Sequence, residues 1–256
     1  MIGRIRAWHD QRRIERRGLQ ALWQAQAPQM AWLQCYSDAE RERIGALALR
    51  FMVRKHILGG AGFAVTEAMR LRVAALAVVP VLGLGLHWYR DWNAVVLYEA
   101  AFIPAHSWQD DAGVVHESDE PLTGEAWMQG PVILSWEDVL ASDDPDHAGY
   151  NVVIHEMAHK LDMLGPGGAN GAPPLHRGMD PQRWHDVMQA AWDDLARAEA
   201  AGEPLPLDPY GLEDAGEFFA VLSECFFDAP GHLAAQWPDV YEQLALFYRQ
   251  DPLGRS

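Results

Sequence analysis

Residues 151–162 read NVVIHEMAHKLD, a run without Pro or Gly in which apolar residues surround two histidines and a glutamate. Positions i and i+4 of an α-helix lie on one face, one turn apart, so His155 and His159 can direct two imidazoles at the same ion. Glu156 follows the first histidine directly, where its carboxylate can reach a water molecule held at that ion. This spacing is typical of zinc peptidases with two His ligands and a Glu base.

The alternative interpretation of this run is an amphipathic helix whose histidines face solvent. However, the apolar residues at positions 152, 154, 157, 158 and 161 lie nearly all the way round the helix. A helix that is apolar all round is buried. Two buried histidines beside a buried glutamate need a partner, and a metal ion supplies one. The pattern therefore favours a buried metal site.

The third ligand has to come from another segment, because catalytic zinc usually has three protein ligands and one open position. The metzincin pattern would place Gly at 162 and His at 165, but these positions hold Asp162 and Gly165, so that class is excluded. The run EDAGEFFAVLSE at 213–224 offers two carboxylates on one helix face, seven residues apart, among apolar neighbours. We expect Glu217 to be the ligand and Glu224 to be a supporting or separately satisfied buried group.

Asp162 is a further candidate for a supporting role, because it follows His159 by three residues and His155 by seven. Metal-bound histidines usually donate their second nitrogen to a carboxylate or a carbonyl. The alternative is an ordinary solvated aspartate at the end of a helix.

The charge distribution bears on the choice of partner. The net charge is −16, yet residues 1–60 hold 11 Lys and Arg against 5 Asp and Glu. The acidic remainder argues against direct nucleic-acid binding, because phosphate repels it. The basic run at 12–17 suits contact with a partner or an anionic surface, or simply a solvated helix face.

The cysteine count and the apolar runs bear on location. The chain has only Cys35 and Cys225, which is no disulfide framework and favours a reducing compartment. The first residues lack the apolar core of a signal peptide. The longest uncharged apolar run, 73–86, is too short to span a bilayer. We therefore expect a cytoplasmic protein without a membrane partner.

Hydrophobic periodicity predicts an α+β fold. The expected strands lie within 93–102, 114–116 and 131–136, and the expected helices at 3–27, 39–56, 66–79, 150–164, 181–200, 213–227 and 232–249. We expect the helices to surround a small mixed sheet, with the zinc cleft between the sheet edge and the two metal-bearing helices. The glycine cluster at 59–62 predicts a boundary between a basic helical N-terminal appendage, 1–60, and a zinc metallopeptidase domain, 61–256.

Several longer motifs carry a family resemblance. They are LTGEAW (122–127), GPVILSWEDV (130–139), NVVIHEMAHKLD (151–162), Asn170-Gly171 with Pro173, DPY (208–210), EFFAVLSECFF (217–227) and FYRQDP (247–252). Through these runs the chain resembles the Mlc titration factor A family of zinc metallopeptidases, which are zincins with a Glu third ligand. The resemblance covers most of the chain and is thinner before residue 60. Met157 departs from the family, which usually has Phe there, and should alter only packing.

The resemblance implies Zn²⁺ on His155, His159 and Glu217, with Glu156 as the catalytic base. It also implies an active-site role for Tyr210, which its sequence context alone would make a packing aromatic in a loop. The family is similar in design to the protease domain of anthrax lethal factor. It is bacterial and cytoplasmic, with peptidase activity on short substrates and binding to the glucose-responsive repressor Mlc. We expect this chain to be aminopeptidase-like on short peptides.

The expected chemistry is peptide hydrolysis by zinc-activated water, with Glu156 transferring the proton. The Tyr210 hydroxyl would stabilise the carbonyl oxygen, and His176 and His185 are alternative donors. The strand at 131–136 would bind an extended peptide at its edge, or else is a plain core strand. The alternative function is a regulatory protein that sequesters a transcription factor, with catalysis secondary. The presence of Glu156 favours catalysis, because a purely structural metal site has no use for a base.

Overall fold

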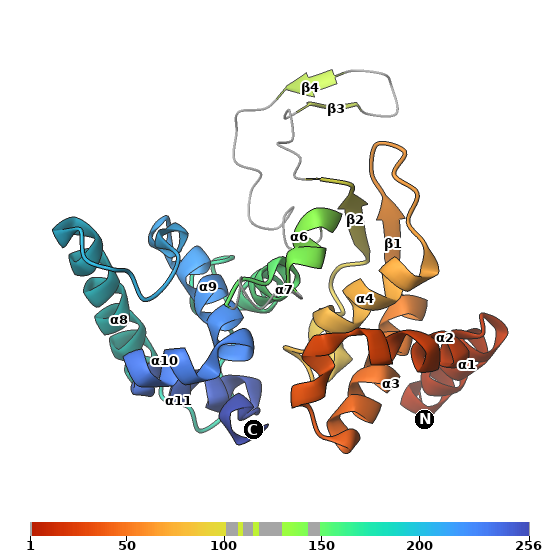
Figure 1. The fold of residues 1–256 in the computed structure, drawn as a ribbon, viewed down its shortest axis with the longest axis horizontal. Coiled ribbons are helices and arrows are strands. Elements are labelled where there is room, and N and C mark those ends of the chain that lie inside the picture. Colours follow the sequence, from red (N-terminus) through yellow and green to blue (C-terminus); the bar gives the residue numbers. More distant parts are fainter. Residues whose placement is uncertain (1, 101–106, 110–114, 118–129, 143–148, 256) are drawn as a thin grey trace.

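The computed structural model describes residues 2–100, 107–109, 115–117, 130–142 and 149–255. In these ranges, α-helices surround a small sheet (Figure 1). The longer helices are α1 (Ile2–Arg16), α2 (Leu19–Gln26), α3 (Asp38–Arg54), α4 (Glu67–Ala77), α6 (Trp136–Ala141), α7 (Val152–Asp162), α8 (Pro181–Ala201), α9 (Ala215–Asp228), α10 (Pro230–Gln236) and α11 (Pro238–Tyr248). The strands are β1 (His56–Gly59), β2 (Ala94–Tyr98), β3 (Ser107–Gln109), β4 (Val115–Glu117) and β5 (Val132–Ser135).

The main sheet has the order β1-β2-β5, with β2 in the centre. Val95 lies opposite Ile57 on one side and Val132 on the other, and all three side chains are buried. The predicted α+β class is confirmed. The prediction that this sheet is mixed is wrong for the described strands, because β2 is parallel to both neighbours. Parallel strands need long crossovers, and α4 lies in the one between β1 and β2.

Helix α3 begins with a reciprocal cap. The Ser37 hydroxyl accepts a hydrogen bond from the backbone N–H of Glu40, and the Glu40 carboxylate accepts one from the backbone N–H of Ser37. The cap satisfies two backbone donors that the first turn of a helix otherwise leaves free. It fixes the start of a helix whose buried face packs against α1 and α4.

Two of the predicted helices are each divided in the structure. The segment predicted as one helix at 3–27 is interrupted at Gly18, which has a left-handed φ of 63° and separates α1 from α2. The segment predicted as one helix at 232–249 is interrupted before Pro238, which occupies the first turn of α11. Proline has no N–H to donate within a helix, so it suits the start of a new helix better than the interior of an old one.

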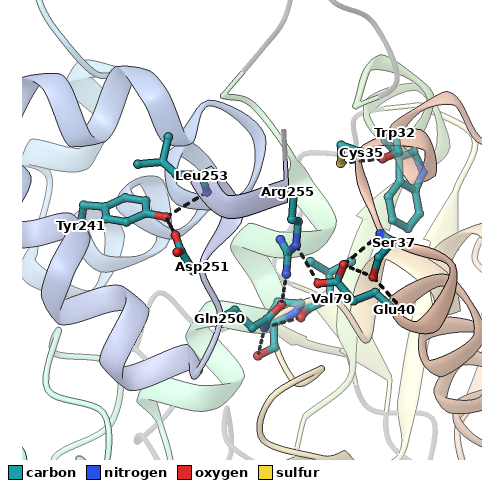
Figure 2. Close-up of polar contacts among 11 residues, drawn as sticks. Trp32, Cys35, Ser37, Glu40, Val79, Tyr241, Gln250, Asp251, Leu253 and Arg255 are labelled. Atoms are coloured by element: carbon teal, nitrogen blue, oxygen red, sulfur yellow. Dashed lines mark hydrogen bonds and ion pairs between the residues drawn. The ribbon is translucent and has the colours of Figure 1, made fainter.

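The C-terminal segment connects two sides of the molecule. Helices α8, α10 and α11 lie on one side of α7, and α1–α4 with β1 and β2 lie on the other (Figure 1). The Arg255 guanidinium donates to Glu40 Oε1 at 3.0 Å and to Gln250 Oε1 at 2.7 Å (Figure 2). It also lies over the ring of Tyr36. Gln250 in turn donates to the carbonyl of Val79 at 2.9 Å. These contacts hold residues 250–255 against the N-terminal helices.

The domain boundary and one of the family motifs remain predictions. The predicted division into 1–60 and 61–256 stays a prediction, and the LTGEAW motif at 122–127 lies outside the described residues. Within the described ranges, no helix has both the length and the hydrophobicity that crossing a membrane requires.

Candidate metal centre

Capping residues fix the starts of α7 and α9, the two helices that form the candidate metal centre. The side chain of Asn151 accepts a hydrogen bond from the N–H of Ile154 at 3.1 Å, so α7 begins directly after Asn151. Asp214 Oδ1 accepts from the N–H groups of Gly216 and Glu217, so Glu217 lies in the first turn of α9. Because α7 packs along α9, this turn faces the histidines of α7.

His155, His159 and Glu217 converge so closely that one potential ligand atom from each lies within 4.8 Å of the others. Glu217 Oε2 is 3.0 Å from Nε2 of His155 and 3.3 Å from Nε2 of His159, and the two Nε2 atoms are 3.1 Å apart. The three side chains are only 12–18% exposed. The structure therefore brings together the three residues predicted as ligands.

The lone pairs of this cluster suit a cation. Glu224 Oε1 lies 2.8 Å from Nδ1 of His155, and a carboxylate only accepts hydrogen bonds, so Nδ1 carries the proton. In the neutral ring, Nε2 then presents a lone pair towards Glu217. Glu217 Oε2 is buried as well. Two imidazole nitrogens and one carboxylate oxygen are a typical donor set for catalytic zinc, so these residues fit the implied metal.

Glu224 fixes the orientation of the His155 ring. Its carboxylate is 4% exposed, and its second oxygen accepts a hydrogen bond from the backbone N–H of Asn151. The residue thus joins α9 both to the start of α7 and to a candidate ligand on α7. Such contacts hold a metal-binding imidazole in one tautomer and one orientation. The geometry agrees with the supporting role expected for Glu224.

Asp162 lies at the end of α7, and its supporting role beside His159 stays a prediction. Its side chain is fully buried, and its Oδ2 accepts a hydrogen bond from the N–H of Gly171 at 2.7 Å. Burial raises the pKa of Asp162 to about 6. No described residue forms a hydrogen bond with Nδ1 of His159. The described contacts therefore make Asp162 an anchor for the loop after α7.

The charges within the cluster would also suit a cation. Burial lowers the pKa of His155, but hydrogen bonds with Glu217 and Glu224 outweigh burial and raise this pKa to about 10. Burial raises the pKa of Glu217, but hydrogen bonds with His155 and His159 outweigh it and lower this pKa to about 2. Without a metal, a proton on the imidazole therefore balances the carboxylates. A bound cation would replace that proton.

Glu156 lies beside the cluster and lines the same cavity as His155. Burial raises the pKa of its carboxyl, although the neighbouring imidazoles oppose this effect. A carboxylate whose pKa is shifted towards neutrality is well placed to take up and release a proton near pH 7.

Tyr210 also lines this cavity, although it comes from a separate short helix, η5 (Pro209–Leu212). Its ring centre lies 6.1 Å from that of His155, and Asp208 Oδ1 accepts from its backbone N–H at 2.9 Å. Partial burial and the charge of Glu217 raise the pKa of Tyr210 to about 12. Its hydroxyl thus stays protonated and able to donate.

The two alternative donors lie elsewhere. His176 contacts the carbonyl of Phe247 through Nε2, at 2.7 Å, and the Arg249 guanidinium through Nδ1. His185 lines a separate cavity, formed in part by α8 and the loop at 166–175. Neither residue lines the cavity of Glu156 and Tyr210.

The helix pair, the convergent donors and the adjacent glutamate match the arrangement expected for the centre of a metallopeptidase. Comparison with known proteins agrees: the chain belongs to the family of glucose-regulated metallopeptidases M90, whose model matches residues 5–249. It is 37% identical over 248 residues to the Mlc titration factor A of Yersinia pestis (strain Pestoides F), and the match covers 91% of each chain. Mlc titration factor A of Yersinia pseudotuberculosis (serotype O:1b, strain IP 31758) matches with the same identity and coverage. The family resemblance expected from the motifs is confirmed.

Proposed function

We propose that this protein is a zinc-dependent peptidase, aminopeptidase-like on short peptides, with His155, His159 and Glu217 as ligands. The observation that carries the proposal is the convergence of these three side chains with Glu156 beside them. Zn²⁺ bound there would supply a Lewis acid that polarises the scissile carbonyl and makes water acidic enough to react near neutral pH.

Three residues of this site have separate roles in the reaction. Glu156 accepts the proton of the attacking water and delivers it to the leaving amine, a role supported by the raised pKa of this carboxyl. The Tyr210 hydroxyl donates a hydrogen bond to the carbonyl oxygen as negative charge develops on it. Glu224 keeps the His155 ring in place throughout.

The charge of the cavity supports cleavage from the amino terminus. The described lining holds Glu156, Asp208 and Glu224 but no Lys or Arg. A free peptide amine is a cation, which the negative field of these carboxylates attracts. A peptide carboxylate would find no cationic side chain among the described lining residues.

Repressor binding is the second candidate function, and it rests on the relatives, which are named Mlc titration factor A. We propose it as a role that accompanies catalysis, or as the main role with catalysis secondary. A repressor partner would require the protein to be in the cytoplasm, and the two free cysteines, Cys35 and Cys225, suit that reducing compartment.

The decisive experiment combines zinc analysis with hydrolysis of chromogenic aminoacyl and short peptide substrates. We expect about one zinc per chain in the wild type and in Glu156→Gln, and loss of zinc in His155→Ala and Glu217→Ala. Glu156→Gln should lose hydrolysis while keeping the metal, and Glu242→Gln, an exposed control on α11, should change neither. A wild type without zinc would overturn the proposal. Full activity in Glu156→Gln would favour the repressor-binding role.

A further inference from the structure

A cavity of about 970 Å³ opens beside the metal centre and has two chemically different parts. His155, Glu156 and Tyr210 form the polar part, which contains the proposed chemistry. The remaining lining is mainly apolar and comes from α7, α9 and the loop before η5. Its apolar members are Val152, Leu205, Pro206, Leu207, Val221, Cys225 and Ala229.

Helix geometry explains why the apolar wall adjoins the metal centre. Val221 and Cys225 follow Glu217 by four and eight residues, so they continue the face of α9 that carries the candidate ligand. Val152 precedes His155 by three residues and lies on the corresponding face of α7. The wall therefore begins about one helical turn, roughly 5 Å, from the candidate ligand Glu217.

Val221 lines the cavity although it is almost completely buried. Its side chain is only 5% exposed, yet it does not belong to the contiguous cluster of core residues that includes Ala220 and Leu222 on either side of it. A buried apolar side chain that lines a cavity instead of filling the core offers its surface to a ligand.

Three polar side chains near this wall already have partners. Glu224 binds His155 and Asn151, and Asp208 binds the backbone N–H of Tyr210. His232 on α10 contacts the carbonyl of Pro206 through Nε2 at 2.6 Å. A polar side chain entering this part of the cavity would lose hydration with little compensation, whereas an apolar one would gain from burial.

We propose that this cavity is the specificity pocket for a bulky apolar side chain of the substrate, with Val221 and Leu207 setting its size. The assignment of that side chain to a peptide rests on the proposed function. His232 is a positioning residue, because it holds the loop that carries Leu205 and Leu207 in place as one wall.

The first test measures kcat/KM of the zinc-loaded protein for the tripeptides X-Ala-Gly and Ala-X-Gly, where X is Ala, Leu, Phe, Glu or Lys. We expect the wild type to prefer Leu or Phe over Ala at one of the two positions by about 10–200-fold. Val221→Phe should narrow the pocket beside the metal centre and reverse this preference. Leu207→Ala should weaken it by several-fold, whereas the control Leu175→Ala, a partly buried leucine in the other cavity, should not.

The second test measures binding without turnover. The probe is L-4-fluorophenylalaninamide, followed by ¹⁹F NMR with the zinc-loaded and the chelator-treated protein. The wild type should broaden the fluorine resonance, and Val221→Phe should abolish this effect at equal melting temperature. Val221→Thr keeps the volume but adds a hydroxyl, so it should weaken binding by several-fold and serves if the larger residue impairs folding.

The two tests separate the two proposals. Probe binding that depends on Val221, in a protein that hydrolyses no peptide, would leave the apolar pocket standing and remove the peptidase function. Hydrolysis of peptides with no preference for apolar side chains, and equal probe binding by the wild type and Val221→Phe, would leave the function standing and overturn the pocket.

Discussion

Glu224 on α9 contacts His155 on α7 through its Oε1 and the Nδ1 of the ring, at 2.8 Å. The opposite nitrogen of the same ring faces Glu217, which lies two turns earlier on α9. One helix thus supplies carboxylates to both sides of one imidazole. Because the two carboxylates contact different nitrogens, removal of Glu217 and removal of Glu224 should affect zinc binding differently.

Glu224→Ala should weaken zinc binding without abolishing it. Loss of a partner that orients a metal-bound histidine typically costs about 10–100-fold in metal affinity. Glu224→Gln should cost less, because its amide oxygen can still accept the Nδ1 hydrogen bond. Chelator competition gives both affinities, with Glu242→Ala as an exposed control. Unchanged zinc affinity in Glu224→Ala would contradict this role.

Tyr210→Phe tests the proposed oxyanion donor. Removal of one such donor costs about 10²–10³-fold in kcat in comparable sites. KM and zinc content should change little, because the hydroxyl acts mainly as charge develops on the carbonyl. Steady-state kinetics with a short peptide and zinc analysis on the same sample provide the measurement. A rise in KM at constant kcat would instead indicate ground-state binding by the hydroxyl.

Gly171→Ala should destabilise the loop that Asp162 anchors. Gly171 has a φ of 74°, and an added Cβ would lie 2.6 Å from the carbonyl oxygen of Ala215 at the start of α9. Backbone strain and this clash together should cost on the order of 2–4 kcal/mol. Gly168→Ala is the matched control. Gly168 has a similar φ of 80°, but no atom lies within 4 Å of the added Cβ. Urea unfolding should show the smaller loss in the control, and equal losses would contradict the steric argument.

Lys55 should make stability depend on pH in the alkaline range. Its ammonium donates to the carbonyls of Tyr89 and Trp92 and lies over the Trp92 ring, and burial, aided by the charge of Lys160, lowers its pKa to about 8. The unfolded chain, with a lysine pKa of about 10.4, binds more protons between these values. The contribution of Lys55 to folding stability should therefore rise as pH rises from about 8 to 10.

The measurement for Lys55 is urea unfolding at pH 7.5 and pH 9.5. We define the difference as the stability at pH 9.5 minus the stability at pH 7.5. This difference should be more positive in the wild type than in Lys55→Met, because the variant has no lysine proton to lose. Other groups that titrate in this range contribute equally to both proteins and cancel. The same difference in both proteins would show that Lys55 does not titrate abnormally.

Local sequence predicted α7 and the placing of its two histidines because the whole pattern lies within three turns of one helix. The division of roles between Glu217 and Glu224 was harder to predict from local sequence. Their spacing puts both on one face of α9, and only the packing of α9 on α7 decides which carboxylate meets which nitrogen. The apolar pocket depends on the loop at 203–208, whose position relative to Val221 no local pattern indicates.

Strand β1 is the main element that sequence analysis missed. Only Lys55 separates it from the end of α3, so helical periodicity appeared to continue to residue 56. Its four residues become a strand by pairing with β2, nearly forty residues later in the chain. The interruption at Gly18 was missed for a different reason: a single left-handed residue separates two helices whose apolar spacing is otherwise continuous.

The contact between Arg255 and Glu40 joins residues 215 positions apart in sequence. A ribosome adding about 5–20 residues per second needs roughly 10–40 s to cover that interval. For most of this time the nascent chain already contains α3 and its cap but lacks the guanidinium that will lie against them. The surface of α3 around Glu40 therefore stays exposed in the N-terminal helices during this time. The contact between Arg255 and Glu40, which links the two sides of the molecule, can form only after synthesis has reached residue 255.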